Sequence, residues 1–163
     1  MSFQKLFTRL ELLNIPYQNY PHNPVMTCAD KIDVEIPAPH TKNLFLKDDK
    51  GKFWLISALD DTRIELTTVA KVLQVKKLRF GSEESLMEHL GVKPGAVTMF
   101  ALINDEQNAV RPLIDERIFQ HEKTCFHPLH NEATTVIASQ DLLRFIIGLG
   151  REYKVLKQQE LSS

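Results

Sequence analysis

The chain begins with an apolar pattern of helical period, and its members are Phe3, Leu6, Phe7, Leu10 and Leu13. We expect Asn14 and Pro16 to end this helix, because proline cannot continue it. A short strand is predicted at Tyr17 to Tyr20. The segment 21–39 contains Pro21, Pro24, Pro37 and Pro39, and such a density of proline predicts a long loop.

Two apolar runs separated by a polar turn predict a β-hairpin in the next part of the chain. The runs are Asn43 to Leu46 and Phe53 to Ala58, and the connection 47–52 carries the glycine and aspartates of a turn. The second run is apolar on both faces, which is typical of a central strand.

Two helices are expected between this hairpin and residue 91. Thr67 or Thr68 is the predicted N-cap of the first helix, which runs through Leu73. The basic residues Lys76, Lys77 and Arg79 follow it. Ser82 is the predicted N-cap of the second helix, 83–90, and Gly91 suits the left-handed position at its C-terminal end.

In the second half of the chain, Val97 to Ile103 is predicted to be a buried strand, and 109–114 a strand whose Pro112 favours a sheet edge. A short helix is expected at 115–120 and a strand at 134–138. Ser139 is the expected cap of a last helix, whose apolar face consists of Leu142, Leu143, Ile146 and Ile147. Because hairpins are present and no regular βαβ repeat is visible, we predict an α+β fold with a mixed, mostly antiparallel sheet.

Composition narrows the class of protein. A chain of 163 residues is ordinarily one domain, so we expect a single domain over 1–163. The net charge of -1 gives no global sign of nucleic-acid binding, and any such partner would be held through a local patch. Cys28 and Cys125 form no CxxC pair, which argues against a zinc ribbon or a disulfide scaffold and suits a reducing compartment. With no signal-peptide core and no membrane-length apolar run, we expect a soluble cytoplasmic protein that contacts no membrane.

Two stretches could carry chemistry in the middle of the chain. Lys42 and Asn43 stand at the start of a predicted buried strand, where a lysine could hold an anion or a polarised carbonyl. The alternative is a solvated strand-end lysine, since most lysines are exposed. Pro94-Gly95 marks a tight turn, whose free N–H groups could bind a carbonyl oxygen; the alternative is a plain turn.

A third stretch contains His127 and His130. Pro128 spoils a helical metal pair and no third ligand is obvious, so we predict no metal site. A histidine acting as a hydrogen-bonding or acid–base group, or one satisfying local backbone groups, is expected instead. Neither cysteine lies in a recognisable catalytic setting, and no GxSxG or P-loop pattern exists, which argues against a nucleophilic mechanism.

Four blocks together resemble the YbaK-type aminoacyl-tRNA editing domains, and among these the freestanding prolyl-tRNA editing proteins. The blocks occur in the family's order with similar spacing, and they are 40–46 (HTKNLFL), 78–82 (LRFGS), 90–98 (LGVKPGAVT) and 127–135 (HPLHNEATT). The resemblance runs from about Leu6 to Gly150. It implies a single domain with a barrel-like sheet core and surrounding helices, and no cofactor.

The resemblance also assigns roles to residues. The family's central lysine falls on Lys42, its neighbouring asparagine on Asn43 and its histidine on His127. The family's glycine loop falls on Gly95, Ala96, Val97, Thr98 and Met99, where Met99 replaces the usual proline. We expect catalysis from Lys42, Asn43, Gly95 and His127, and substrate contacts from the rest of that loop. The segment from Met26 through Ile32 to Ile36 is the predicted lid of the pocket, and the tRNA contacts are Lys42, Lys76, Lys77 and Arg79.

The implied activity is hydrolysis of alanine from mischarged alanyl-tRNA(Pro), without metal or cofactor. The implied partners are the acceptor end of tRNA(Pro) carrying alanine and, transiently, prolyl-tRNA synthetase. The alternatives are a non-catalytic module that binds tRNA or the synthetase, which the departure at Met99 keeps open, and a different specificity such as cysteinyl-tRNA(Pro).

Overall fold

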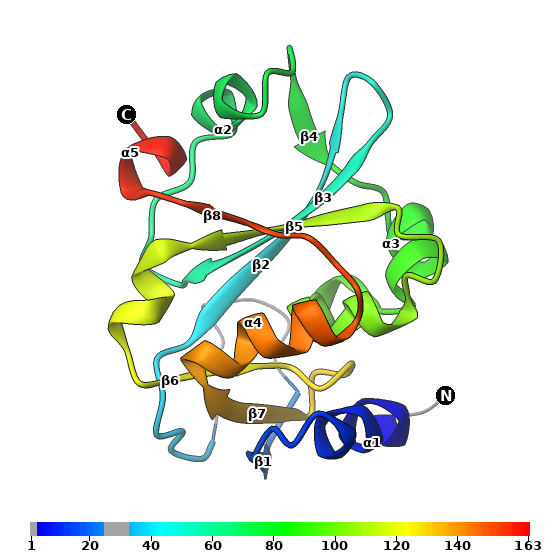
Figure 1. The fold of residues 1–163 in the computed structure, drawn as a ribbon, viewed down its shortest axis with the longest axis vertical. Coiled ribbons are helices and arrows are strands. Elements are labelled where there is room, and N and C mark those ends of the chain that lie inside the picture. The colour runs from blue at the N-terminus through cyan, green and yellow to red at the C-terminus, as the bar shows by residue number, and fades with distance from the viewer. Residues whose placement is uncertain (1–2, 25–32) are drawn as a thin grey trace.

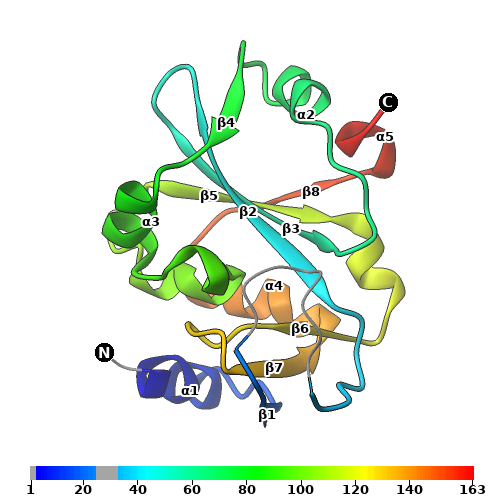
Figure 2. The same cartoon turned by 180° about the vertical axis from the view of Figure 1, so that it is seen from behind.

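The computed structural model describes residues 3–24 and 33–163, and it contains two β-sheets with helices packed around them (Figures 1 and 2). The strands are β1 (Tyr17–Pro21), β2 (Thr41–Asp48), β3 (Phe53–Leu59), β4 (Leu78–Phe80), β5 (Val110–Asp115), β6 (Lys123–Phe126), β7 (Ala133–Ala138) and β8 (Lys154–Leu156). The α-helices are α1 (Phe3–Leu12), α2 (Leu66–Val72), α3 (Glu83–Leu90), α4 (Ser139–Gly148) and α5 (Gln158–Leu161). Three 3₁₀ helices complete the set: η1 (Pro94–Ala96), η2 (Met99–Asn104) and η3 (Glu116–Gln120).

The larger sheet has five strands in the order β4-β2-β3-β5-β8, and the smaller has three in the order β1-β7-β6. Strand pairs β2–β3, β2–β4, β1–β7 and β6–β7 are antiparallel, whereas β3–β5 and β5–β8 are parallel. The predicted α+β class with a mixed, mostly antiparallel sheet is therefore confirmed. Both sheets are open, so the expected barrel-like core is not a closed barrel.

Both faces of the larger sheet are covered, which explains why all seven residues of β3 are buried. One face packs against α1, α3, η2, α4 and the smaller sheet, and its core includes Phe45, Leu55, Phe100, Phe126 and Phe145. The other face packs against α2 and α5, through Leu46, Trp54, Ile56, Val69 and Leu161. Apolar residues of β2 alternate between the two cores, as the pleat of a strand requires.

Several local predictions are confirmed. The first helix and the β2–β3 hairpin occur where their apolar patterns place them. The Ser82 hydroxyl accepts a hydrogen bond from the N–H of Ser85 (3.0 Å) and so caps α3. Gly91 ends that helix in the left-handed conformation, with φ of 64°. These features depend on residues close in sequence.

The prediction of a strand at Val97 to Ile103 is wrong, because the chain forms η1 and η2 there. The hydroxyl of Thr98 accepts a hydrogen bond from the N–H of Phe100 (3.3 Å), which caps η2 at its start. Met99 to Ile103 are all buried, so the apolar pattern of the run does not distinguish a strand from a helix.

The prediction that Pro112 marks an edge strand is also wrong, since β5 lies between β3 and β8. However, β8 pairs only with residues Leu113 to Asp115. At Pro112 itself β5 therefore pairs only with β3, and its other side has no neighbouring strand. A proline, which lacks an N–H donor, is tolerated at such a position without loss of a hydrogen bond to β8.

Two predicted caps are wrong. The N-cap of α2 is Glu65 and not Thr67 or Thr68. The N-cap of α4 is Ala138, and the predicted cap Ser139 is the first residue of the helix. The strands β4, β6 and β8 were not predicted, because each has only three or four residues. Within the described part of the chain, no helix combines the length and the apolar character that crossing a bilayer would need.

Candidate functional site

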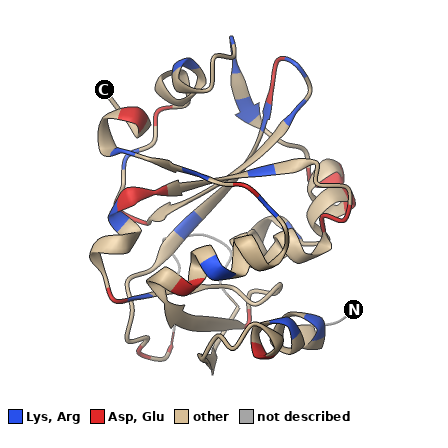
Figure 3. Ribbon diagram, viewed as in Figure 1, with Lys and Arg blue, Asp and Glu red and all other residues tan. Residues whose placement is uncertain are grey.

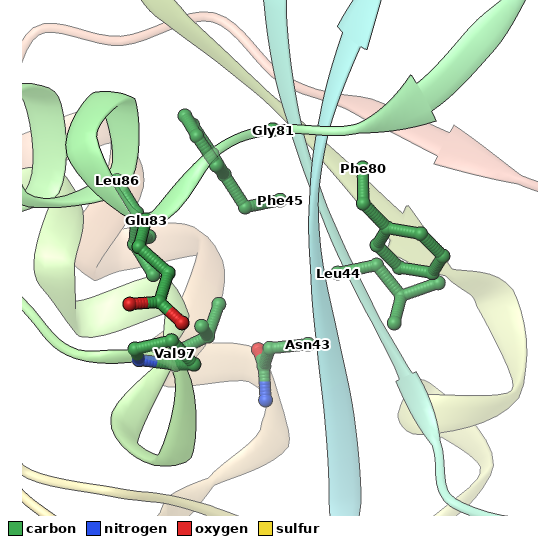
Figure 4. Close-up of a pocket in the computed structure, with 9 residues that line it drawn as sticks. Asn43, Leu44, Phe45, Phe80, Gly81, Glu83, Leu86 and Val97 are labelled. Atoms are coloured by element: carbon green, nitrogen blue, oxygen red, sulfur yellow. The ribbon is translucent and has the colours of Figure 1, made fainter.

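A pocket with a volume of about 320 Å³ lies at the edge of β2 (Figure 4). Its walls come from β2, from the end of β4 through the first turn of α3, and from the η1 turn. The lining residues are Asn43, Leu44, Phe45, Phe80, Gly81, Glu83, Leu86, Pro94 and Val97. The pocket therefore joins the first two of the three candidate stretches, which lie about fifty residues apart in the sequence.

The pocket exists because β2 loses its outer partner partway along its length. β4 pairs only with Leu46 to Asp48, and one further hydrogen bond runs from the Gly81 N–H to the Phe45 carbonyl (2.9 Å). In an antiparallel strand, residues two apart direct their backbone groups to the same side. The N–H and C=O of Asn43 therefore face the same open edge as the Phe45 carbonyl, beside the pocket.

Hydrogen bonds fix the side chain of Asn43. Its Oδ1 accepts a short hydrogen bond from the Ser57 hydroxyl on the neighbouring strand, and its Nδ2 approaches the Thr41 Oγ1 at 3.4 Å. Asn43 and Ser57 are register partners, so the pleat brings them together. With Oδ1 engaged, the amide presents its N–H₂ group as the donor of the site.

The Thr41 hydroxyl links the larger sheet to the third candidate stretch. It donates to the carbonyl of Cys125 (2.7 Å) on β6, and His127 follows two residues later. All three candidate stretches therefore come together at the start of β2.

The environment of His127 defines its protonation. Its Nδ1 lies 3.0 Å from the Ala133 carbonyl, which can only accept, so Nδ1 carries the proton and Nε2 is the acceptor of the neutral ring. Burial lowers the pKa of this imidazole below the ordinary 6.5, and the neighbouring His22, His130 and His40 lower it further. The Ala133 carbonyl opposes this shift without reversing it. His127 is therefore neutral near pH 7.

His22 was not among the predicted site residues. Its ring centroid lies 6.3 Å from that of His127, and its Nε2 lies 2.7 Å from the hydroxyl of Thr134. It comes from the segment after β1, whose pairing with β7 brings it close. No sequence motif signals that proximity.

The predicted glycine loop is only partly at the pocket surface. Gly95 lies in the first turn of η1, before the first intrahelical bond, which the Ala96 N–H donates to the Lys93 carbonyl (2.9 Å). Its own N–H thus has no intrahelical partner. Val97 lines the pocket, whereas Ala96, Thr98 and Met99 are buried beneath it.

Met99 is 0% exposed and belongs to the core. A methionine at this position therefore changes the packing under the pocket and not the lining of its surface. Thioether side chains adapt well to irregular core space, which is compatible with this position.

Lys42 lies on the other face of β2 from Asn43. Its register partner is Ala58, and the pleat groups it with Leu44. Leu44 lines the pocket although it faces away from Asn43 and Phe45, which shows that the pocket extends around the strand's edge (Figure 4). Lys42 is half-buried at that same edge, two residues before Leu44, without itself lining the pocket.

The predicted basic cluster lies at the far end of β2. The N–H groups of Lys76 and Lys77 donate to the Asp49 carboxylate (2.8 and 3.2 Å), just past the end of β2, and Arg79 pairs with Lys47. Figure 3 shows basic residues on and next to β4 at this end of the molecule. Position 48 is six residue steps along the strand from position 42, a distance of about 20 Å. The structure does not bring Lys42 together with the other predicted tRNA contacts.

The predicted lid and the observed lining of the pocket differ from one another. The predicted lid residues Met26 and Ile32 lie outside the described residues. Glu83 and Phe80 line the pocket but were not predicted, because an acidic residue in a first helical turn is ordinarily explained by the helix dipole. In Figure 4 the side chains of Glu83 and Asn43 both point toward Val97.

The chemistry available follows from these groups. Burial raises the pKa of the Cys125 thiol to about 12, so this thiol is not an activated nucleophile. Within residues 3–24 and 33–163, no three His, Cys, Asp or Glu side chains gather as metal ligands. A neutral imidazole, a fixed amide and a backbone N–H are groups of the kind that orient a water and polarise a carbonyl, and of the three residues that supply them only Asn43 lines the pocket itself.

Comparisons with known proteins agree on one family. The family model described as "Aminoacyl-tRNA editing domain" matches residues 22–145. "Prolyl-tRNA editing protein ProX" of Acetoanaerobium sticklandii is 34% identical over 157 residues, covering 94% of this chain and 96% of that protein. "Prolyl-tRNA synthetase associated domain-containing protein 1" of Bos taurus is 36% identical over 155 residues, covering 91% of this chain and 90% of that protein.

Among solved structures, the fold is similar to that titled "Crystal structure of a putative trans-editing enzyme for prolyl tRNA synthetase". The TM-score is 0.71 at 17% identity, with 96% of this chain and 97% of the other covered. At that identity the likeness concerns the fold.

Proposed function

The chain belongs to the aminoacyl-tRNA editing domain family, and on that premise we propose that it is a trans-editing deacylase acting on mischarged tRNA(Pro). The amino acid removed is alanine, and residues 1–163 form one editing domain. The partners are the acceptor end of tRNA(Pro) and, transiently, prolyl-tRNA synthetase. The relatives at 34% and 36% identity, whose names refer to prolyl-tRNA editing and to prolyl-tRNA synthetase, support the choice of tRNA.

One observation carries the proposal: three distant segments meet at the start of β2. The pocket joins Asn43 to Val97, and the Thr41 hydroxyl joins β2 to the carbonyl of Cys125, two residues before His127. Asn43 lines the pocket, whereas Gly95 and His127 belong to segments that meet it there, and we propose that the amide, the Gly95 N–H and the neutral imidazole act on one bound ester. These are the groups that ester hydrolysis by a positioned water needs.

In the proposed mechanism, the substrate is the ester between alanine and the 3′-terminal adenosine. The N–H of Gly95 receives the ester carbonyl and stabilises the oxyanion as water adds to the carbonyl carbon. Nδ2 of Asn43 orients that water, and Nε2 of His127 accepts a proton from it and returns the proton to the ribose oxygen that leaves. The tetrahedral intermediate then collapses, the ester C–O bond breaks, and alanine and the tRNA hydroxyl leave. Lys42 holds a phosphate of the terminal nucleotides from the edge of β2.

Selectivity for alanine over proline follows from the size of the amino acid that each pocket can hold. A proline site excludes larger amino acids by steric clash but admits the smaller alanine, and it loses only apolar contact, worth roughly 10–200-fold for each missing methylene. A second site that is too small for proline can remove alanine selectively. Val97 is one of the apolar residues that line the pocket, and in this proposal its side chain restricts the size of the amino acid that can enter.

We expect the purified protein to deacylate alanyl-tRNA(Pro) at least roughly 100-fold faster than prolyl-tRNA(Pro), given the double-sieve logic. The measurement is release of labelled amino acid from alanyl-, cysteinyl- and prolyl-tRNA(Pro) at equal concentration. Preference for cysteine would contradict the alanine assignment. Tight tRNA binding without turnover would contradict the enzyme and favour a non-catalytic module.

Activity should fall in acid as His127 becomes protonated, because an imidazolium has no lone pair at Nε2. The pKa of His127 is lowered by burial, so this loss is expected below pH 6.5 and not at it. The pH dependence of kcat measures this. His127→Ala should lower kcat by roughly 100-fold and remove the acid inflection, in line with loss of an acid–base group.

His121→Ala is the matched control for that variant, since His121 is exposed at the end of η3. It should retain both the rate and the inflection. An inflection that persists in His127→Ala would assign the titration to another group, such as His22, His40 or His130.

A further inference from the structure

Phe80 presents an aromatic ring at the mouth of the pocket. It is the last residue of β4, it lines the pocket, and 63% of its surface is exposed. Phe3 and Tyr153 are also exposed aromatic residues, but they are only 38% and 37% exposed and do not line the pocket. A ring so exposed contributes little to folding, because apolar side chains stabilise a fold by leaving water.

Phe80 lies on the same face of the sheet as Lys42. Leu46 is its register partner, and Lys42, Leu44 and Leu46 share one face of β2. Figure 4 shows the Phe80 ring beside Leu44, on the far side of β2 from Phe45. Leu44 therefore lies between Lys42 and Phe80 on this face. Its Cα is roughly 7 Å from the Cα of Lys42, two residues along the strand, and a similar distance from the Cα of Phe80, its diagonal neighbour on β4.

We propose that Phe80 stacks on a base of the substrate's single-stranded 3′ end while Lys42 contacts a phosphate of the same strand. This inference rests on the proposed function and adds a positioning residue to it. Proteins bind single-stranded nucleic acid by combining basic groups along the backbone with aromatic rings under the bases. The face of the sheet that carries Lys42, Leu44 and Phe80 provides one basic group and one aromatic ring. One or two nucleotides can span the distance between them.

The first test is steady-state deacylation of alanyl-tRNA(Pro) by Phe80 variants. Base–aromatic stacking contributes roughly 1–3 kcal/mol, so Phe80→Ala should raise KM by about 5- to 150-fold. The kcat should stay within about twofold, since stacking holds the strand equally before and during reaction. Phe80→Trp and Phe80→Tyr should restore KM, whereas Phe80→Leu, which is apolar but not aromatic, should not. Met87→Ala, on the exposed surface of α3, is the control and should behave as wild type.

The second test measures binding without turnover. The single tryptophan of the chain, Trp54, is buried, so Phe80→Trp introduces the one exposed indole. An uncharged RNA minihelix ending in CCA should quench this new fluorescence, and a minihelix with the single-stranded end removed should not.

These measurements separate the two proposals. If wild type deacylates alanyl-tRNA(Pro) and Phe80→Ala or Phe80→Leu keeps the wild-type KM, stacking by Phe80 is refuted while the function stands. If wild type releases no amino acid, the proposed function fails, and the minihelix titration alone decides the stacking: equal quenching by both minihelices refutes it.

Discussion

Lys42→Ala is expected to abolish deacylation of alanyl-tRNA(Pro), with a loss of at least about 100-fold, because a 3′ end no longer held by its phosphate leaves the ester out of its reacting position. The fold should survive. Lys42 is half-buried at the end of β2, and it makes no ion pair within the described residues. Truncating such a side chain ordinarily changes stability by less than about 0.5 kcal/mol.

The measurement is single-turnover release of alanine, with circular dichroism and thermal unfolding on the same samples. Lys50→Ala, in the exposed turn between β2 and β3, is the matched control for loss of one positive charge and should keep the wild-type rate. Lys42→Arg should recover tRNA binding in part, because it keeps the charge at the strand edge. Wild-type turnover by Lys42→Ala would remove Lys42 from the mechanism.

Arg151→Met is expected to destabilise the protein by about 3–5 kcal/mol, the usual cost of leaving one partner of a buried ion pair alone. Arg151 and Asp105 are 8% and 4% exposed, and Nη1 of the arginine donates to Oδ2 of the aspartate (3.0 Å). The same guanidinium donates to the carbonyls of Val110 and Asp105. The carboxylate also accepts from the N–H groups of Ala109 and Val110, so the network holds the start of β5.

Denaturant unfolding would measure this loss, and thermal unfolding should show a fall of roughly 6–20 °C for a chain of this size. Arg63→Met is the control. Its ion pair with Glu65 is as short (2.9 Å), but the arginine side chain is 75% exposed, so less than about 1 kcal/mol should be lost. Equal losses in the two variants would mean that burial does not govern the contribution of Arg151.

The sequence predicts the elements whose signals are local. The helical repeat from Phe3, the turn chemistry of the β2–β3 connection and the Ser82–Gly91 pair all act within one or two turns of chain. Their physical causes are complete in the sequence, so the structure matches them closely.

The wrong predictions depend on long-range context. Met99 to Ile103 are all buried, and only packing against α3 and β3 selects a helix there. Pro112 tolerates an inner strand because β8 begins one residue later, which depends on residues about forty positions downstream. Strands such as β4 and β8 have three residues each and form only because a longer neighbour is already in place.

The candidate site also has features with local sequence signals and features that depend on long-range context. Asn43, Gly95 and His127 are identifiable from their motifs, and the structure brings their segments together. That the pocket opens around the edge of β2 depends on where β4 stops pairing. For this reason the sequence reveals neither the separation of Lys42 from Lys76 and Lys77 nor the contributions of Phe80 and Glu83.

The link between Thr41 and the Cys125 carbonyl has a consequence for durability. Asn43 belongs to one sheet and His127 to the chain that follows the other, so the distance between these two proposed catalytic residues depends on how the two sheets are held together. A small shift of one sheet against the other would misalign the two side chains while each sheet kept its own hydrogen bonds. We therefore expect heating or denaturant to abolish activity before either sheet loses its hydrogen bonding.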